Sequence, residues 1–130
     1  MTRKRVFNTK SFDRWAKKVL KDALLCAAAR EIEQGMYEAD LGQGVCKKRI
    51  AVPGQGKRGG TRTLVAKRHV AAIIFLVGRE KNEPGADFPD AVVEAAKIVA
   101  SGLDTQPIGR LEQLAADGRL KEICNAEEKQ

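Results

Sequence analysis

Residues 41–79 read LGQGVCKKRIAVPGQGKRGGTRTLVAKRHVAAIIFLVGR, and this stretch decides the fold. Its β-branched and apolar residues predict three strands, at residues 45–52, 62–68 and 70–78. A loop with four glycines in eight residues, 53–60, joins the first two strands. The run from Val70 to Val77 is apolar on both faces, which is typical of a central strand covered from both sides. The sequence therefore predicts an antiparallel meander.

The same stretch carries the positive charge of the protein. It contains nine Lys and Arg residues and no Asp or Glu, whereas the whole chain has 24 basic and 17 acidic residues. The rest of the chain therefore has 15 basic and 17 acidic residues and is close to neutral. A basic sheet with a glycine-rich loop at one end indicates a surface that binds a polyanion.

Helical patterns lie on both sides of the meander. Before it, Phe12, Trp15, Ala16 and Val19 form the apolar stripe of one helix, and a second helix is predicted over residues 21–34. A short first strand is expected at Val6 and Phe7, and a turn at residues 37–44. After the meander, a helix capped by Asp87 is expected to end before Gly102, with a core stripe of Val92, Val93, Ala96 and Val99. A short helix from Thr105 to Gly118 follows, and then a strand or a packed tail at residues 120–124.

Composition limits the classes of protein that are possible. With 130 residues and 43% hydrophobic residues, the chain is expected to form one globular domain. No apolar run approaches the roughly 20 residues of a membrane helix, and no apolar segment of a secretory signal follows the basic residues at the start. Cys26, Cys46 and Cys124 are odd in number and scattered, so we expect free thiols, no metal site and a cytoplasmic location.

The geometry of a meander predicts which charges meet. Antiparallel connection returns Arg79 to the end of the sheet that holds Arg62, and it places His69 at the other end, on the order of 20 Å away. His69 is the only histidine and is expected to be an exposed turn residue. Alternation puts Lys47 and Arg49 on one face of the first strand, whereas Lys48 falls on the apolar face without a physical explanation. The predicted cluster consists of Lys47, Arg49, Lys57, Arg58, Arg62, Arg79 and Lys81.

Four segments together resemble the RelE/ParE superfamily of bacterial type II toxins. They are DLGQGV at residues 40–45, KKR at 47–49, PGQG through GGTRTLV at 53–65 and FLVGREKNE at 75–83. The chain is similar in particular to RelE-like toxins with an extended C-terminal region. The resemblance implies an α+β fold in which an N-terminal helical hairpin packs on a small, mostly antiparallel sheet, with C-terminal helices. It covers one domain with a structured core at about residues 5–124 and a frayed tail at 125–130.

The resemblance also implies an activity, namely that of a metal-independent endoribonuclease without a cofactor. Such an mRNA interferase cuts mRNA in the ribosomal A site through attack of a ribose 2′-OH on the adjacent phosphate. A cognate antitoxin, of helix–turn–helix type, would block the basic face, and promoter DNA would be bound only through the antitoxin complex; no membrane is involved. By position, the catalytic candidates are Lys47, Arg49, Arg62, Arg79 and Lys81, and the RNA-binding candidates are Lys48, Lys57, Arg58 and Asn82.

Two alternatives remain open at this level. One is a ParE-like toxin that inhibits DNA gyrase on the same fold, and the other is a non-catalytic module that binds nucleic acid. The set of Lys47, Arg49 and Arg62 favours the nuclease, because gyrase inhibition does not require a cluster that cleaves phosphate. Some relatives use a tyrosine near the C-terminal end for proton transfer, and this sequence has none there. A lysine in a dense positive field is one candidate base; alternatively, the ribosome orients the substrate and the protein stabilises charge.

Overall fold

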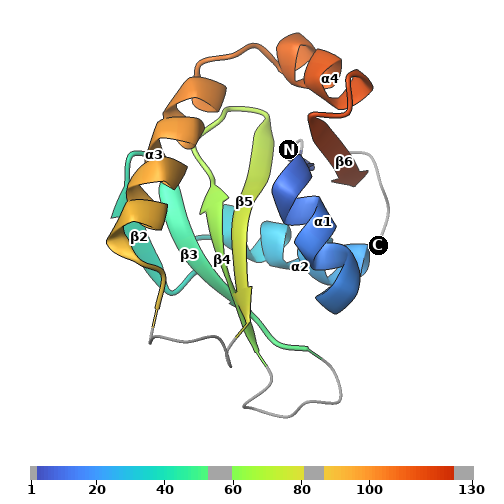
Figure 1. Ribbon diagram of the computed structural model, residues 1–130. Coiled ribbons are helices and arrows are strands. Elements are labelled where there is room, and N and C mark those ends of the chain that lie inside the picture. Colours follow the sequence, from blue (N-terminus) through green and yellow to red (C-terminus); the bar gives the residue numbers. More distant parts are fainter. Residues whose placement is uncertain (1–2, 53–59, 81–86, 125–130) are drawn as a thin grey trace.

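The computed structural model describes residues 3–52, 60–80 and 87–124, and Figure 1 shows their arrangement. In chain order the elements are β1 (Arg5–Thr9), α1 (Lys10–Val19), α2 (Asp22–Glu33), β2 (Ala39–Gly42), β3 (Val45–Ile50), β4 (Thr61–Ala66), β5 (Ala72–Glu80), α3 (Asp90–Asp104), α4 (Ile108–Ala116) and β6 (Leu120–Cys124). The fold is α+β, as predicted from the sequence.

The six strands form one sheet in the order β2-β3-β4-β5-β1-β6. All neighbouring pairs are antiparallel except β1 and β5, which run parallel. The predicted meander is confirmed as β3-β4-β5 at the centre of the sheet. β1 enters the sheet beside β5, and β6 closes the edge next to it (Figure 1).

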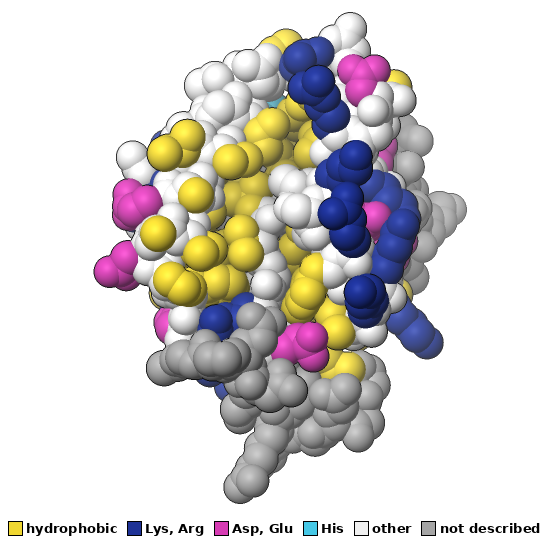
Figure 2. All heavy atoms as spheres, in the orientation of Figure 1, with side chains coloured by type: hydrophobic (Ala, Val, Ile, Leu, Met, Phe, Trp, Pro, Cys, Tyr) yellow, Lys and Arg dark blue, Asp and Glu magenta, His cyan; other side chains and the backbone are white. Residues whose placement is uncertain are grey.

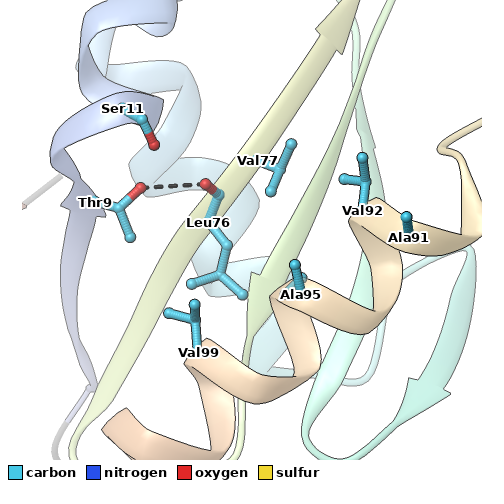
Figure 3. Close-up of a pocket in the computed structure, with 9 residues that line it drawn as sticks. Thr9, Ser11, Leu76, Val77, Ala91, Val92, Ala95 and Val99 are labelled. Atoms are coloured by element: carbon cyan, nitrogen blue, oxygen red, sulfur yellow. Dashed lines mark hydrogen bonds between the residues drawn. The ribbon is translucent and has the colours of Figure 1, made fainter.

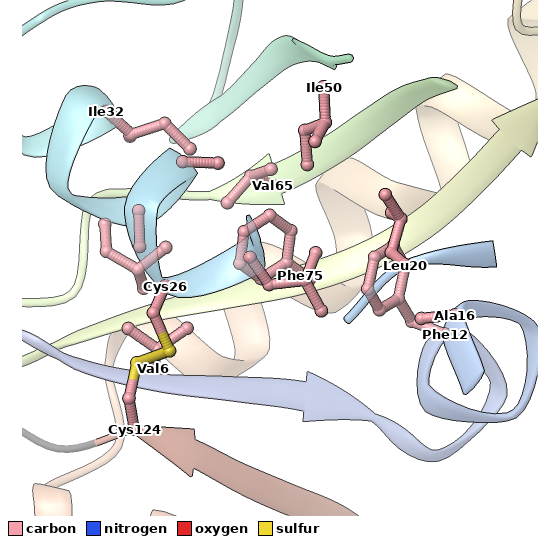
Figure 4. Packing of buried hydrophobic residues seen from close by; sticks show 14 of the residues in the cluster. Val6, Phe12, Ala16, Leu20, Cys26, Ile32, Ile50, Val65, Phe75 and Cys124 are labelled. Carbon is pink, nitrogen blue, oxygen red and sulfur yellow. A yellow bond between two sulfur atoms is a disulfide. The ribbon is translucent and has the colours of Figure 1, made fainter. Parts of the chain in front are cut away.

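Helices cover both faces of the sheet. Side chains alternate along β5, so Ile73 and Phe75 pack with residues of α1 and α2, whereas Ile74 and Leu76 pack with residues of α3 and α4. On the first face the rings of Phe12 and Phe75 stack with centroids 5.3 Å apart (Figure 4). The doubly apolar pattern of the sequence thus marks a central strand buried on both sides.

One edge of the sheet and the start of β5 differ from the predictions. Residues 39–42 form strand β2 rather than part of a turn, and the turn into β3 is confined to Gln43 and Gly44, which have positive φ angles of 52° and 81°. At the other edge, the strand alternative for residues 120–124 is confirmed, since these residues form β6 and pair with β1. β5 begins at Ala72 rather than Val70, which is 89% exposed, because the side chain of His69 accepts the Ala71 N–H in a turn.

Helix α3 ends later than predicted, and one residue of its predicted core stripe lies at the surface. It begins after Pro89, and its buried residues are Ala96 and Ala100, while Val99 is 45% exposed. Gly102 lies inside the helix, which continues to Asp104. Of the predicted core stripe, Ala96 is buried and Val92 and Val93 pack against the core, whereas Val99 is at the surface.

The prediction of three free thiols is wrong. Cys26 of α2 and Cys124 of β6 form a disulfide across a sequence separation of 98 residues (Figure 4). The pairing was not predictable, because it depends on β6 joining the edge of the sheet under α2. Cys46 is the remaining free cysteine; it is buried, and burial raises the pKa of its thiol to about 12. In the parts of the chain that the structure describes, no helix is both long enough and apolar enough to cross a membrane.

Candidate functional site

Three arginines lie side by side across the meander at one end of the sheet. Arg49 of β3 is the register partner of Arg62 of β4, and Arg62 is the partner of Arg79 of β5. Directly opposite residues of antiparallel strands have Cβ atoms about 4.5–5.5 Å apart, so the three side chains are neighbours. We call Arg49, Arg62 and Arg79 the arginine row.

The arginine row is graded in depth. Arg79 is buried, Arg62 is half-buried and Arg49 is exposed. The residue before Arg79 shows which face of the sheet the arginine row occupies. Gly78 faces Trp15 of α1, so the alternation of side chains along β5 directs Arg79 to the opposite face, towards α3. A row of guanidinium groups that runs from the interior to the surface is a site where an anion gains charge-assisted hydrogen bonds in a partly desolvated setting.

Lys47 extends the site along β3. It lies two residues before Arg49, on the same face, and its Nζ forms an ion pair with the carboxylate of Asp87. The hydrogen bond from Lys47 holds the pKa of Asp87 below its ordinary value, and the positive charge of Arg62 acts in the same direction. The sequence suggested Asp87 as a helix cap, and no feature of the sequence pointed to its contact with Lys47, 40 residues away.

Lys48 does not join the arginine row. It points to the opposite face of the sheet and is buried, where Nζ donates to the Met36 carbonyl oxygen at 2.8 Å and pairs with Glu31 Oε1 at 2.7 Å. These contacts explain why a lysine occupies the apolar face of β3. The other expected contributors, Lys57, Arg58, Lys81 and Asn82, lie outside the described residues.

His69 lies near the other end of β4, as predicted, but it is buried rather than exposed. Nδ1 accepts the Ala71 N–H at 2.9 Å, so Nε2 carries the proton that is donated to the Gln106 carbonyl oxygen at 2.7 Å. Both ring nitrogens therefore serve the turn between β4 and β5 and its contact with the α3–α4 connection. Nearby, burial raises the pKa of the Asp104 carboxyl.

The chemistry that the site offers is cationic. Within residues 3–52, 60–80 and 87–124, no group of three or more His, Cys, Asp and Glu side chains is placed to hold a metal ion. The arginine row and Lys47 supply planar, bidentate donors and one compact ammonium on a single face. Donors of this kind suit an oxyanion and negative charge that develops on it.

Fold and site together define a class of protein, a small α+β domain with a cationic site at the end of a mixed sheet between two helical layers. The model of the family described as the RelE toxin of the RelE/RelB toxin–antitoxin system matches residues 4–123, and the chain belongs to this family. The resemblance noted in the sequence is thereby confirmed. A comparison with curated proteins finds no significant match. Family membership makes the protein a toxin of a toxin–antitoxin system and implies a cognate RelB-type antitoxin as its partner.

Proposed function

We propose that this toxin is an endoribonuclease that cuts mRNA on the ribosome and that the arginine row binds the phosphate to be cleaved. The observation that carries the proposal is the register of Arg49, Arg62 and Arg79 on three adjacent strands. Membership in the RelE toxin family supports it, because toxins of this family are generally endoribonucleases. The location that this activity requires is the cytoplasm, as the sequence predicts.

The chemistry requires charge stabilisation above all. The 2′-hydroxyl of the ribose loses its proton as its oxygen bonds to the adjacent phosphorus. The bond from phosphorus to the 5′-oxygen breaks, and a proton passes to that leaving oxygen. Negative charge gathers on the phosphate in the transition state, where preorganised cationic donors act most strongly. Arg62 is central in the row, and its planar fork suits a bidentate phosphate contact.

The ion pair between Lys47 and Asp87 supports a role for Lys47 in charge stabilisation. It holds Lys47 Nζ on the face of the sheet that carries Arg49, where its charge can act on a bound phosphate. Asp87 is then a positioning residue that holds the ammonium beside the arginine row. Lys57, Arg58, Lys81 and Asn82 stay predictions from the sequence.

The experiment is a short induction in bacteria of the wild type, Arg62→Ala and Arg68→Ala, followed by primer extension on an abundant message. Arg68 is exposed and lies beyond the far end of β4, so its variant removes the same charge outside the site. We expect discrete cuts within translated codons for wild type and Arg68→Ala, and a loss of roughly 100- to 1,000-fold for Arg62→Ala. Growth arrest with intact message would favour gyrase inhibition instead, and the absence of arrest would favour a non-catalytic module.

A further inference from the structure

An apolar groove lies between α3 and the junction of β1 with α1 (Figure 3). Its volume is about 520 Å³, and β5 forms its floor. The apolar side chains that line it include Leu76, Val77, Ala91, Val92, Ala95 and Val99. Figure 2 shows this apolar surface open to solvent on the same face of the molecule as α3. We call it the α3 groove.

Thr9, one of the two polar residues that line the α3 groove, already has hydrogen-bond partners. Thr9 Oγ1 donates to the Leu76 carbonyl oxygen at 3.1 Å and accepts the Phe12 N–H at 3.2 Å (Figure 3). The Thr9 hydroxyl is therefore already engaged and is not available to bind a polar ligand. The groove instead suits apolar side chains, whose burial contributes about 25 cal/mol per Å².

The occupant that fits the α3 groove is a helix rather than a strand. β5 is paired with β4 and β1 on its two sides, so its backbone has no free edge for an added strand. Ala91, Ala95 and Val99 recur every four residues along the open face of α3, and such small side chains let a second helix approach closely. From residue 91 to residue 99 the wall is about 12 Å long, or two helical turns.

Charge specifies the polar side of that helix. Ser11 of α1 lines the groove, and the exposed residues Arg14 and Lys18 follow it three and seven positions later, on the same face of α1. Figure 2 shows Lys and Arg side chains in a column beside the apolar surface, over α1. The net charge of +7 disfavours a second copy of this chain in the groove and favours an acidic partner.

We propose that the α3 groove anchors one amphipathic helix of the cognate antitoxin, with an apolar stripe between α3 and β5 and acidic side chains towards Arg14 and Lys18. The partner follows from the toxin family, and the consequence for activity rests on the proposed function. Val77 in the floor is two residues from Arg79, so a helix docked here ends beside the arginine row. The anchor of the antitoxin is thus the groove, and the arginine row is not needed for binding.

The experiment measures the affinity of purified cognate antitoxin for toxin variants by calorimetry. Ala95→Glu and Val99→Glu place a charge in the groove, and Glu is a good helix former, so α3 should stay intact. Ile98→Glu is the matched control, because Ile98 is on the same helix, is 75% exposed and does not line the groove. We expect the dissociation constant to rise at least roughly 100-fold for the two groove variants and to change less than about three-fold for Ile98→Glu.

Arg62→Ala separates this inference from the proposed function. Binding of the antitoxin to Arg62→Ala within about three-fold of wild type supports the groove as anchor, whether or not the free toxin cleaves RNA. If Arg62→Ala loses antitoxin binding while Ala95→Glu keeps it, the groove is not the anchor and the antitoxin masks the arginine row directly. Equal losses of affinity for Ile98→Glu and Ala95→Glu would also overturn the proposal. If a groove variant fails to fold, alkylation of Val99→Cys replaces it: the antitoxin should protect this thiol, and unchanged labelling would contradict the proposal.

Discussion

The ring of Trp15 lies directly on the backbone of Gly78. A Cβ atom added at residue 78 would come within 2.0 Å of Trp15 Cζ3 and 2.2 Å of Trp15 Cε3. The contact joins α1 to β5 one residue before Arg79. It therefore fixes which side chains of β5 face α1 and which face α3, and with them the direction of the buried end of the arginine row.

Gly78→Ala should destabilise the fold, because the indole must move to admit one methyl group. Overpacking of this kind costs about 1–3 kcal/mol of the free energy of unfolding, measured by urea denaturation. Gly102→Ala is the control: nothing lies within 4 Å of its added Cβ, and in a helix interior the change should stabilise by about 0.5–1 kcal/mol. A Gly78→Ala variant as stable as wild type would show that Trp15 moves away without loss.

Lys48→Ala should lower stability without removing a contact to RNA. It removes the buried ammonium that donates to the Met36 carbonyl oxygen and pairs with Glu31, and the loss of such a charge-assisted hydrogen bond costs about 1.5–3 kcal/mol in the free energy of unfolding. The cleavage rate of the folded fraction, measured well below the midpoint of unfolding, should stay within about two-fold of wild type, because Lys48 lies on the opposite face of the sheet from the arginine row. A folded Lys48→Ala variant with a strongly reduced cleavage rate would instead indicate that Lys48 contacts RNA.

The centre of the sheet was predictable, whereas strand β2 at one edge was not. Period-two alternation and short connections were enough to place β3, β4 and β5 and to bring Arg62 and Arg79 to one end. The pairing of Arg49 with Arg62 could not be predicted, because it depends on the register between β3 and β4. A slip of one residue would turn every side chain of a strand to the other face. The partners of Lys48 and Asp87 come from segments far away in sequence, and such contacts leave no local pattern.

The disulfide between Cys26 and Cys124 should make the stability of the toxin depend on redox conditions. It closes a loop across 98 residues, and removal of a bridge of this kind costs about 2–5 kcal/mol. Addition of dithiothreitol should lower the urea midpoint of the wild type, whereas Cys26→Ala should not respond. Because the cytosol keeps most thiols reduced, the reduced protein is the form to assay for activity. A wild-type midpoint that is indifferent to reductant would contradict the prediction.

Asp104 should give the stability a pH dependence of known sign. Burial raises the pKa of its carboxyl above about 3.8, and among the described residues neither of its oxygens has a hydrogen-bond partner. The folded state then holds the proton more tightly than the unfolded chain does. The contribution of Asp104 to the free energy of unfolding therefore falls as pH rises from the ordinary to the raised pKa. Asp104→Asn removes this titration, so the stability difference between Asn and Asp should grow with pH through that window and level off above it. A difference that shrinks with pH would reverse the assignment.

Asp87→Asn should slow cleavage, because it releases the ammonium of Lys47 from its position beside the arginine row. Exposed ion pairs contribute about 0.2–1 kcal/mol, which corresponds to a rate lower by up to about five-fold. The measurement is single-turnover cleavage of message on programmed ribosomes, with Asp90→Asn at the start of α3 as the matched control. If Asp87 acts through Lys47, Asp87→Asn should cost nothing further in a Lys47→Ala background. Faster cleavage by Asp87→Asn would instead show that the carboxylate repels the phosphate, and that Asp87 does not position Lys47.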